Sequence, residues 1–133
     1  MMHDQITLPG PFEAAVARVT EALAAEGFGI ISRIDLAQAF RDKLGAAFRP
    51  FLILGACNPG LAHRAVSARP EIGLMLPCNV TVEAAGEGAL VRLPDARAMM
   101  AAAGPEAAAE LEPLGEDAAQ RLERVAARLR GEG

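Results

Sequence analysis

The sequence predicts an α/β (α+β) fold, in which about five strands and the helices packed on them form a two-layer α/β sandwich. Short apolar runs of strand length alternate along the chain with segments whose apolar residues recur at every third or fourth position. Glycine or proline separates most of these segments, as expected where one element ends and another begins. The 133 residues fit one domain, and 52% of them are hydrophobic, which is enough for a buried core.

The expected order is strand, helix, strand, helix, strand, helix, two strands and two helices, within a single domain over residues 1–133. Its core would span about residues 3–97, and a helical tail would follow over about residues 95–131. The last helix of this tail would present one apolar face: Leu114, Ala118, Leu122, Val125 and Leu129.

The N-terminal third predicts two strands and two helices. A weak alternation over residues 3–8 suits a strand, and Gly27 can end the following helix. That helix carries one apolar stripe: Phe12, Val16, Val19 and Leu23. The next strand would place three apolar side chains on the same face as Ser32: Phe28, Ile30 and Ile34.

Asp35 is expected to begin the second helix, because its carboxylate can cap the first turn and Gln38 completes a capping-box pattern. The buried stripe of this helix would be Leu36, Phe40 and Leu44. Every residue from Phe51 to Leu54 is apolar, whereas a strand wet on one face would alternate. Residues 51–56 therefore predict a central strand that is buried on both faces.

Asn58 and Pro59 predict the start of a third helix, because asparagine caps helices and proline suits their first position. Pro70 would stop this helix. Residues 72–83 are interpreted as one long strand whose even-numbered side chains, Cys78 included, point to the core.

Pro77 interrupts the hydrogen-bond ladder of this expected strand, so it needs an edge position, a bulge or a local break. The turn Gly86-Glu87-Gly88 would join the strand to a partner over residues 89–93 and form a β-hairpin.

Charge and composition argue against several function classes. The net charge is −4 and no basic patch precedes the last helix, so a nucleic-acid partner is not expected. No apolar stretch approaches the roughly eighteen residues that span a bilayer, and no signal-peptide pattern is present, so a membrane partner is not expected either. The two cysteines form no Cys-x-x-Cys pair and are expected to be free thiols in the cytoplasm.

Four short segments occur in an order that resembles a known family. They are Gly27-Phe28-Gly29-Ile30-Ile31, Ile34-Asp35, Leu52-Ile53-Leu54-Gly55-Ala56-Cys57-Asn58-Pro59 and Gly73-Leu74-Met75-Leu76-Pro77-Cys78-Asn79-Val80. From about Ile6 to Arg97 the chain resembles the domain-of-unknown-function family 302 of bacteria and archaea, and the two Cys-Asn segments together make the resemblance specific. It implies a compact α/β domain that is homodimeric, with no established reaction. One departure is Arg33, where the family commonly has an acidic residue.

Cys57 is the strongest candidate for chemistry. It ends the apolar strand and directly precedes a helix N-terminus, where free amides and the helix dipole can stabilise a thiolate. The same turn could hold a carboxylate or a phosphate. In the simpler interpretation, Cys57 is a small buried hydrophobe and Asn58 only caps the helix.

The candidate ligand-binding residues are Cys57, Asn58, Cys78 and Asn79. Each asparagine directly follows a cysteine, and a side-chain amide can orient a ligand or satisfy a broken backbone. The paired motifs of the family imply that the two cysteines lie close together, in which case they could form a redox pair. Cys78 faces the core by its position in the strand, so packing alone is the other explanation for it.

A metal site is not expected, because the possible ligands His3, His63 and the two cysteines show no spacing of a known site. His63 would be a solvated residue of the third helix. No particular cofactor is indicated, since the chain has neither a P-loop nor a complete Gly-x-Gly-x-x-Gly.

Three functions are compatible with these patterns. The first is a homodimeric small-ligand-binding or regulatory module without catalysis, with its pocket near the four candidate residues. The second is a thiol-dependent enzyme or redox protein that uses Cys57, with Cys78 as the resolving partner. The third is a structural interaction domain whose tail helix docks on a partner. A lowered thiol pKa would favour the second function, a cavity the first, and a flat apolar patch the third.

Overall fold

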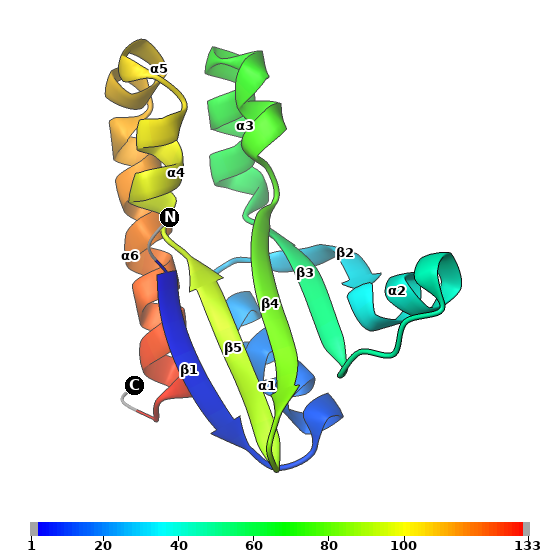
Figure 1. The fold of residues 1–133 in the computed structure, drawn as a ribbon. Helices are drawn as coiled ribbons and strands as arrows, with labels where there is room; N and C mark the ends of the chain where they lie inside the picture. Colours follow the sequence, from blue (N-terminus) through cyan, green and yellow to red (C-terminus); the bar gives the residue numbers. More distant parts are fainter. Residues whose placement is uncertain (1–2, 132–133) are drawn as a thin grey trace.

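The computed structural model describes residues 3–131 and confirms the α+β class (Figure 1). One open sheet has the strand order β1-β5-β4-β3-β2, and all neighbouring strands are antiparallel. The strands are β1 (His3–Pro9), β2 (Gly29–Asp35), β3 (Phe51–Cys57), β4 (Cys78–Ala85) and β5 (Gly88–Pro94). The helices are α1 (Phe12–Ala25), α2 (Leu36–Leu44), α3 (Pro59–Ala68), α4 (Ala96–Ala102), α5 (Pro105–Glu110) and α6 (Glu112–Leu129), with a 3₁₀ turn η1 (Pro70–Met75) before β4.

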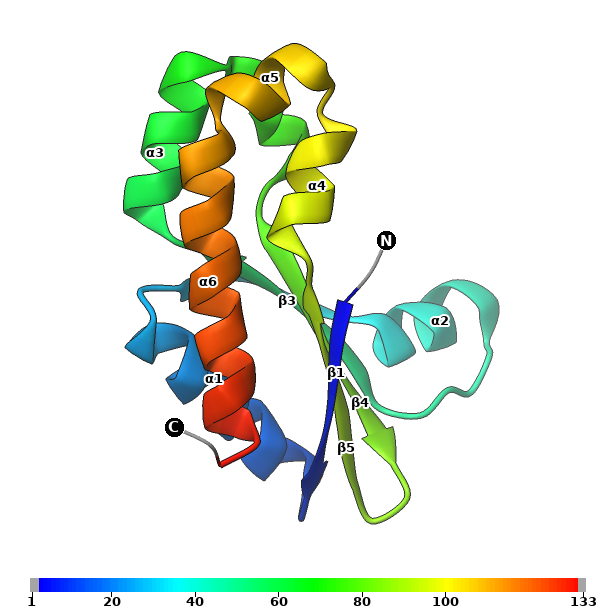
Figure 2. The same cartoon turned by 90° about the vertical axis from the view of Figure 1, so that its left-hand side faces the viewer.

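Two helices cover one face of the sheet. Figure 2 shows α1 and α6 together on one side of the strands and α2 on the other. The core lies between the sheet and these two helices, and α6 contributes three of its large side chains: Leu122, Val125 and Leu129. The C-terminal helix is therefore part of the core and not an appendage to it.

The local signals for helix ends are confirmed. Gly27 follows α1 in the left-handed region, at φ +86°. The backbone N–H of Gln38 donates to Asp35 Oδ1 over 2.9 Å and caps α2. The side chain of Gln38 donates to Asp42 instead of returning to the cap, so one half of the capping box forms.

The prediction of which side chains of the second strand face the core is wrong after Ile30. A bulge lies between Ile30, which pairs with Ala56, and Ser32, which pairs with Gly55. The extra residue reverses the alternation, so Ile34 lies opposite Ile53 on the face that α1 and α6 leave open. Ile34 is 47% exposed there.

The expectation that residues 51–56 are buried on both faces is also wrong. β3 is an interior strand with Leu52, Leu54 and Ala56 buried, but Phe51 and Ile53 on the open face are only half-buried. An antiparallel sheet needs helices on one face only, and here the other face is partly covered by α2 and the loop after it.

Of the stripe expected to be buried in α2, Leu36 and Phe40 are half-buried and Leu44 is exposed. Figure 1 shows α2 near the start of β3, away from α1 and α6. Ala37 is the buried residue of this helix, whereas Leu44 is 74% exposed. Phe40 packs edge-on against Phe48 with ring centres 5.3 Å apart, which fastens α2 to the following loop.

Residues 72–77, expected as the first half of a long strand, form no strand. Pro70 opens the turn η1, a cis peptide joins Leu76 to Pro77, and β4 begins only at Cys78. The two prolines cannot donate to a ladder, and this outweighs the apolar alternation. From Cys78 onward the alternation holds, and the hairpin turn between β4 and β5 forms where it was expected.

Candidate functional site

A cavity lies where β3 ends and β4 begins, under α3, α4 and α6. It offers about 70 Å³ to the centres of water-sized molecules, several times the roughly 10–15 Å³ that one water needs. Its walls are mostly apolar and include Phe28, Leu61, Ile72, Leu114 and Ala118. We call it the β3–β4 cavity.

Three of the four candidate ligand-binding residues line this cavity. Cys57 is the last residue of β3, Cys78 is the first of β4, and antiparallel pairing brings these ends together because Ala56 lies opposite Cys78. Asn58 accepts a hydrogen bond from the backbone N–H of Leu61 over 3.1 Å and caps α3 as expected. Chain order and register therefore place both thiols at the same end of these two neighbouring strands.

The two thiols have different surroundings. Both are free; Cys78 is buried and Cys57 is half-buried. Burial, with a smaller contribution from the nearby Cys57, raises the pKa of the Cys78 thiol to about 11. Cys78 is thus a neutral thiol near pH 7.

Asn79 and His63 lie away from the cavity walls. Asn79 pairs with Gly55 and is exposed on the open face of the sheet. His63 is exposed on α3, as expected of a solvated helical residue. Among residues 3–131, no group of three or more His, Cys, Asp or Glu side chains is placed to hold a metal ion.

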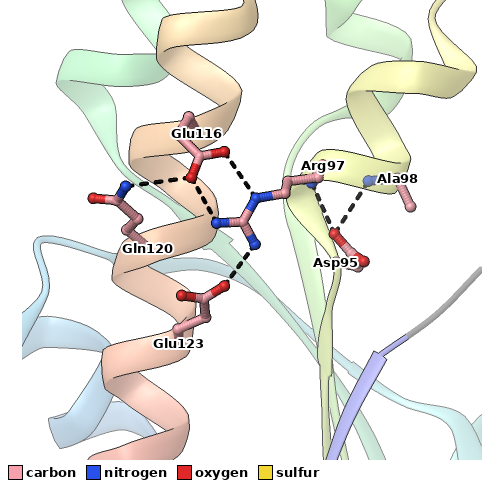
Figure 3. Close-up of polar contacts among 6 residues, drawn as sticks. All are labelled: Asp95, Arg97, Ala98, Glu116, Gln120 and Glu123. Carbon is pink, nitrogen blue, oxygen red and sulfur yellow. Dashed lines mark hydrogen bonds and ion pairs between the residues drawn. The ribbon is translucent and has the colours of Figure 1, made fainter.

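Arg97 fastens two walls of the cavity together (Figure 3). It donates to Glu116 over 2.6 and 2.8 Å and to Glu123 over 2.5 Å, joining the first turn of α4 to α6. Hydrogen bonds from Arg97 and Gln120 lower the pKa of the Glu116 carboxyl to about 2. Asp95 caps α4 at the same point by accepting from two backbone N–H groups.

Sequence reasoning missed a second polar cluster beside the cavity. Glu26, at the end of α1, is 7% exposed and accepts from Arg124 over 2.7 Å and Arg128 over 3.1 Å. The hydrogen bond from Arg124 is the main cause that lowers the pKa of this carboxyl, against the opposing effect of burial. Arg121 donates to the backbone carbonyl of Glu26 over 2.9 Å. The positions of the three arginines put them on one helix face, which was the available signal.

Gly27 lets this cluster approach the cavity. A Cβ at Gly27 would lie 2.9 Å from Asn58 Nδ2 and 3.3 Å from Arg121 Nη1, which is too close for a side chain. The glycine therefore ends α1 and also makes room for the asparagine that caps α3.

A buried carboxylate on the open face of the sheet was missed as well. Glu83 of β4 accepts from Arg92 and, over 2.6 Å, from Arg49. Burial opposes its charge, but the bonds from the two arginines outweigh burial and lower the pKa of Glu83. This group lies on the opposite face from the core side chains and takes no part in the cavity.

Comparisons with known proteins agree with this architecture. The crystal structure of an uncharacterized conserved protein DUF302 from Bacillus stearothermophilus is similar with a TM-score of 0.83 and 25% sequence identity, over 97% of this chain and 98% of that one. No curated protein matches the chain. Within residues 3–131, no helix is both long and apolar enough to cross a bilayer.

The family match extends beyond the segments that carry the sequence resemblance. Domain of unknown function DUF302 matches residues 4–129, which includes α6 together with the sheet. The reason is visible in the core, where α6 buries its apolar stripe against the strands. The chain belongs to the DUF302 family.

Proposed function

We propose that this protein is a cytosolic, homodimeric module that binds a small, weakly polar ligand in the β3–β4 cavity and does not act as an enzyme. The observation that carries the proposal is the cavity itself, whose walls are apolar apart from Asn58 and the two thiols. Ligand sites in proteins commonly combine such walls with a few polar groups that orient the ligand. Free thiols suit a reducing compartment.

The chemistry of Cys78 favours binding over thiol catalysis. A resolving cysteine attacks as a thiolate, and a thiol with a pKa of about 11 supplies little thiolate near pH 7. No carboxylate or histidine that could take its proton lines the cavity. A redox role for the Cys57–Cys78 pair is therefore the weaker alternative.

Filling the cavity tests the proposal. The probe is the uncharged dye N-phenyl-1-naphthylamine, whose fluorescence rises in apolar surroundings. Ala118 lies on the cavity wall, so Ala118→Leu should weaken dye binding by about tenfold or more, equivalent to about 1.4 kcal/mol. Ala127→Leu is the matched control, because Ala127 lies on the same helix outside the cavity wall. Equal binding by all three proteins, or no binding by the wild type, would contradict the proposal.

The homodimer is proposed to form through β2 and the segment that follows it. β2 is an edge strand, and exposed large apolar side chains gather from it to the loop after α2: Ile31, Ile34, Leu44 and Phe48. An exposed edge with apolar side chains favours pairing with a second copy.

A positive charge introduced into this apolar edge should break the dimer. Ile31 is 65% exposed, so Ile31→Lys is expected to leave the fold intact and to yield monomers at micromolar concentration. Leu74→Lys is the control, because Leu74 is 92% exposed on η1, outside β2 and α2. Light scattering measures the mass of each. A monomeric wild type, or dimers for Ile31→Lys, would exclude this interface.

A further inference from the structure

Sulfur-containing residues of four separate elements line the β3–β4 cavity. Every cysteine and methionine among residues 3–131 lines it: Cys57 of β3, Met75 of η1, Cys78 of β4, and Met99 and Met100 of α4. If these methionines served packing alone, leucine or isoleucine could replace them. No other methionine occurs within residues 3–131, so methionine is confined to the walls of this cavity.

The other wall residues exclude the harder ligand types. No histidine, aspartate, glutamate, lysine or arginine lines the cavity, and Asn58 is its single polar amide. Zinc sites draw on cysteine, histidine and carboxylate, whereas thiolate and thioether sulfur together select monovalent copper. The sequence-based prediction of no metal site considered only cysteine and histidine as ligands and did not include methionine thioethers.

We propose that the β3–β4 cavity binds one Cu(I) ion through the sulfur atoms of Cys57 and Cys78 and at least one methionine thioether. The inference rests on the proposed role of this cavity as a binding site and assigns to that site a soft metal ion, a ligand distinct from the weakly polar molecule proposed above.

The binding step balances without any redox change. Two S–H bonds break, two S–Cu bonds form, two protons leave to solvent, and copper stays monovalent. The resulting complex carries one net negative charge. The N-terminus of the ten-residue helix α3 lies directly after Cys57, and its dipole favours an anion at that point.

Competition with a coloured chelator measures this binding. Reduced, oxygen-free protein is titrated against the Cu(I) complex of bathocuproine disulfonate, and the loss of colour gives stoichiometry and affinity. We expect one Cu(I) per chain. Cys57→Ser and Cys78→Ser should each weaken Cu(I) binding by about a hundredfold. Loss of a residue that only orients a metal ligand already lowers metal affinity by roughly 10–100-fold. The triple variant Met75→Leu, Met99→Leu, Met100→Leu should weaken it by about tenfold.

Matched controls separate the site from general metal binding. His63→Ala removes an exposed ligand outside the cavity and should keep the wild-type affinity. Wild-type affinity in the triple leucine variant or in either serine variant would overturn the proposal, as would the absence of a one-to-one complex. X-ray absorption of the wild-type complex does not depend on any variant folding, and a nitrogen or oxygen shell around copper would also overturn it.

The dye experiment distinguishes the two proposals. N-phenyl-1-naphthylamine needs no sulfur, so the triple leucine variant should bind it as the wild type does. Dye binding without Cu(I) binding would reject copper and leave the proposed small-ligand function standing. Cu(I) binding without dye binding would reject the weakly polar ligand and keep the metal site.

Discussion

Cys57 and Cys78 lie at the same end of neighbouring strands, yet their surroundings differ. Cys57 is half-buried at the N-terminus of α3, whereas Cys78 is buried under the helices and its pKa is raised to about 11. Burial shields Cys78 from reagents, and its raised pKa keeps it protonated. Both effects slow its reactions, since the thiolate is the nucleophile.

Alkylation should therefore be selective. With iodoacetamide at pH 8, we expect Cys57 to react at least about tenfold faster than Cys78 in the native protein, because a thiol with a pKa near 11 is almost wholly protonated there. Peptide mass spectrometry follows each site, with Cys57→Ser and Cys78→Ser confirming the assignment. The rate at Cys78 should rise as the pH approaches 11. Equal rates at both cysteines would contradict the described burial.

At this scale the sequence was informative where the signal is local. Asn58 caps α3 as the Asn58-Pro59 pair predicts, because capping depends on a few consecutive residues. The methionines of the cavity were not predicted. Their convergence depends on how α4 and η1 pack over the sheet, and no short-range pattern encodes that.

Helices and strands were predicted well where turns and caps define them, and poorly where tertiary contacts do. The hairpin between β4 and β5 and the end of α1 at Gly27 follow from glycine chemistry. The bulge in β2 reversed the expected alternation of its side chains. The turn before β4 replaced the first half of the expected long strand. The stripe of α2 predicted burial, but the helix lies beyond the main helical layer, so Leu44 is exposed.

The ion pair between Arg97 of α4 and Glu116 of α6 should make the stability of the folded protein depend on pH. Arg97 holds the pKa of Glu116 near 2, below its ordinary 4.5, so the charged carboxylate stabilises the folded protein above about pH 4.5. That contribution disappears as the pH falls from about 4.5 through 2. Glu116→Gln should therefore lower the urea midpoint at pH 7, and its difference from the wild type should shrink across this window.

The control for this pair is Glu112→Gln, which removes an exposed carboxylate from the first turn of the same helix. It should change the urea midpoint less at pH 7 than Glu116→Gln does. A difference between Glu116→Gln and the wild type that stays constant from pH 7 to pH 2 would mean that the Arg97 contact does not contribute to stability in this way.

In the whole molecule, the sheet and α6 act together to shape the cavity. The strands bring Cys57 and Cys78 to one edge, α3 begins at that edge, and α4 is fastened to α6 above it. The fold class and chain order followed from the sequence because they depend on periodicity and breaks. The cavity could not be predicted because it depends on the fit of several helices.

The most direct test of the cavity as the binding site uses the methyl groups of the methionines. The chain has five methionines, of which Met75, Met99 and Met100 line the cavity. With methyl-labelled methionine, titration of the full chain with N-phenyl-1-naphthylamine should shift these three NMR signals, because an aromatic ring nearby changes their chemical shifts. Single substitutions of Met75, Met99 and Met100 assign the three signals. The absence of a shift in all three signals at saturating dye would contradict the account.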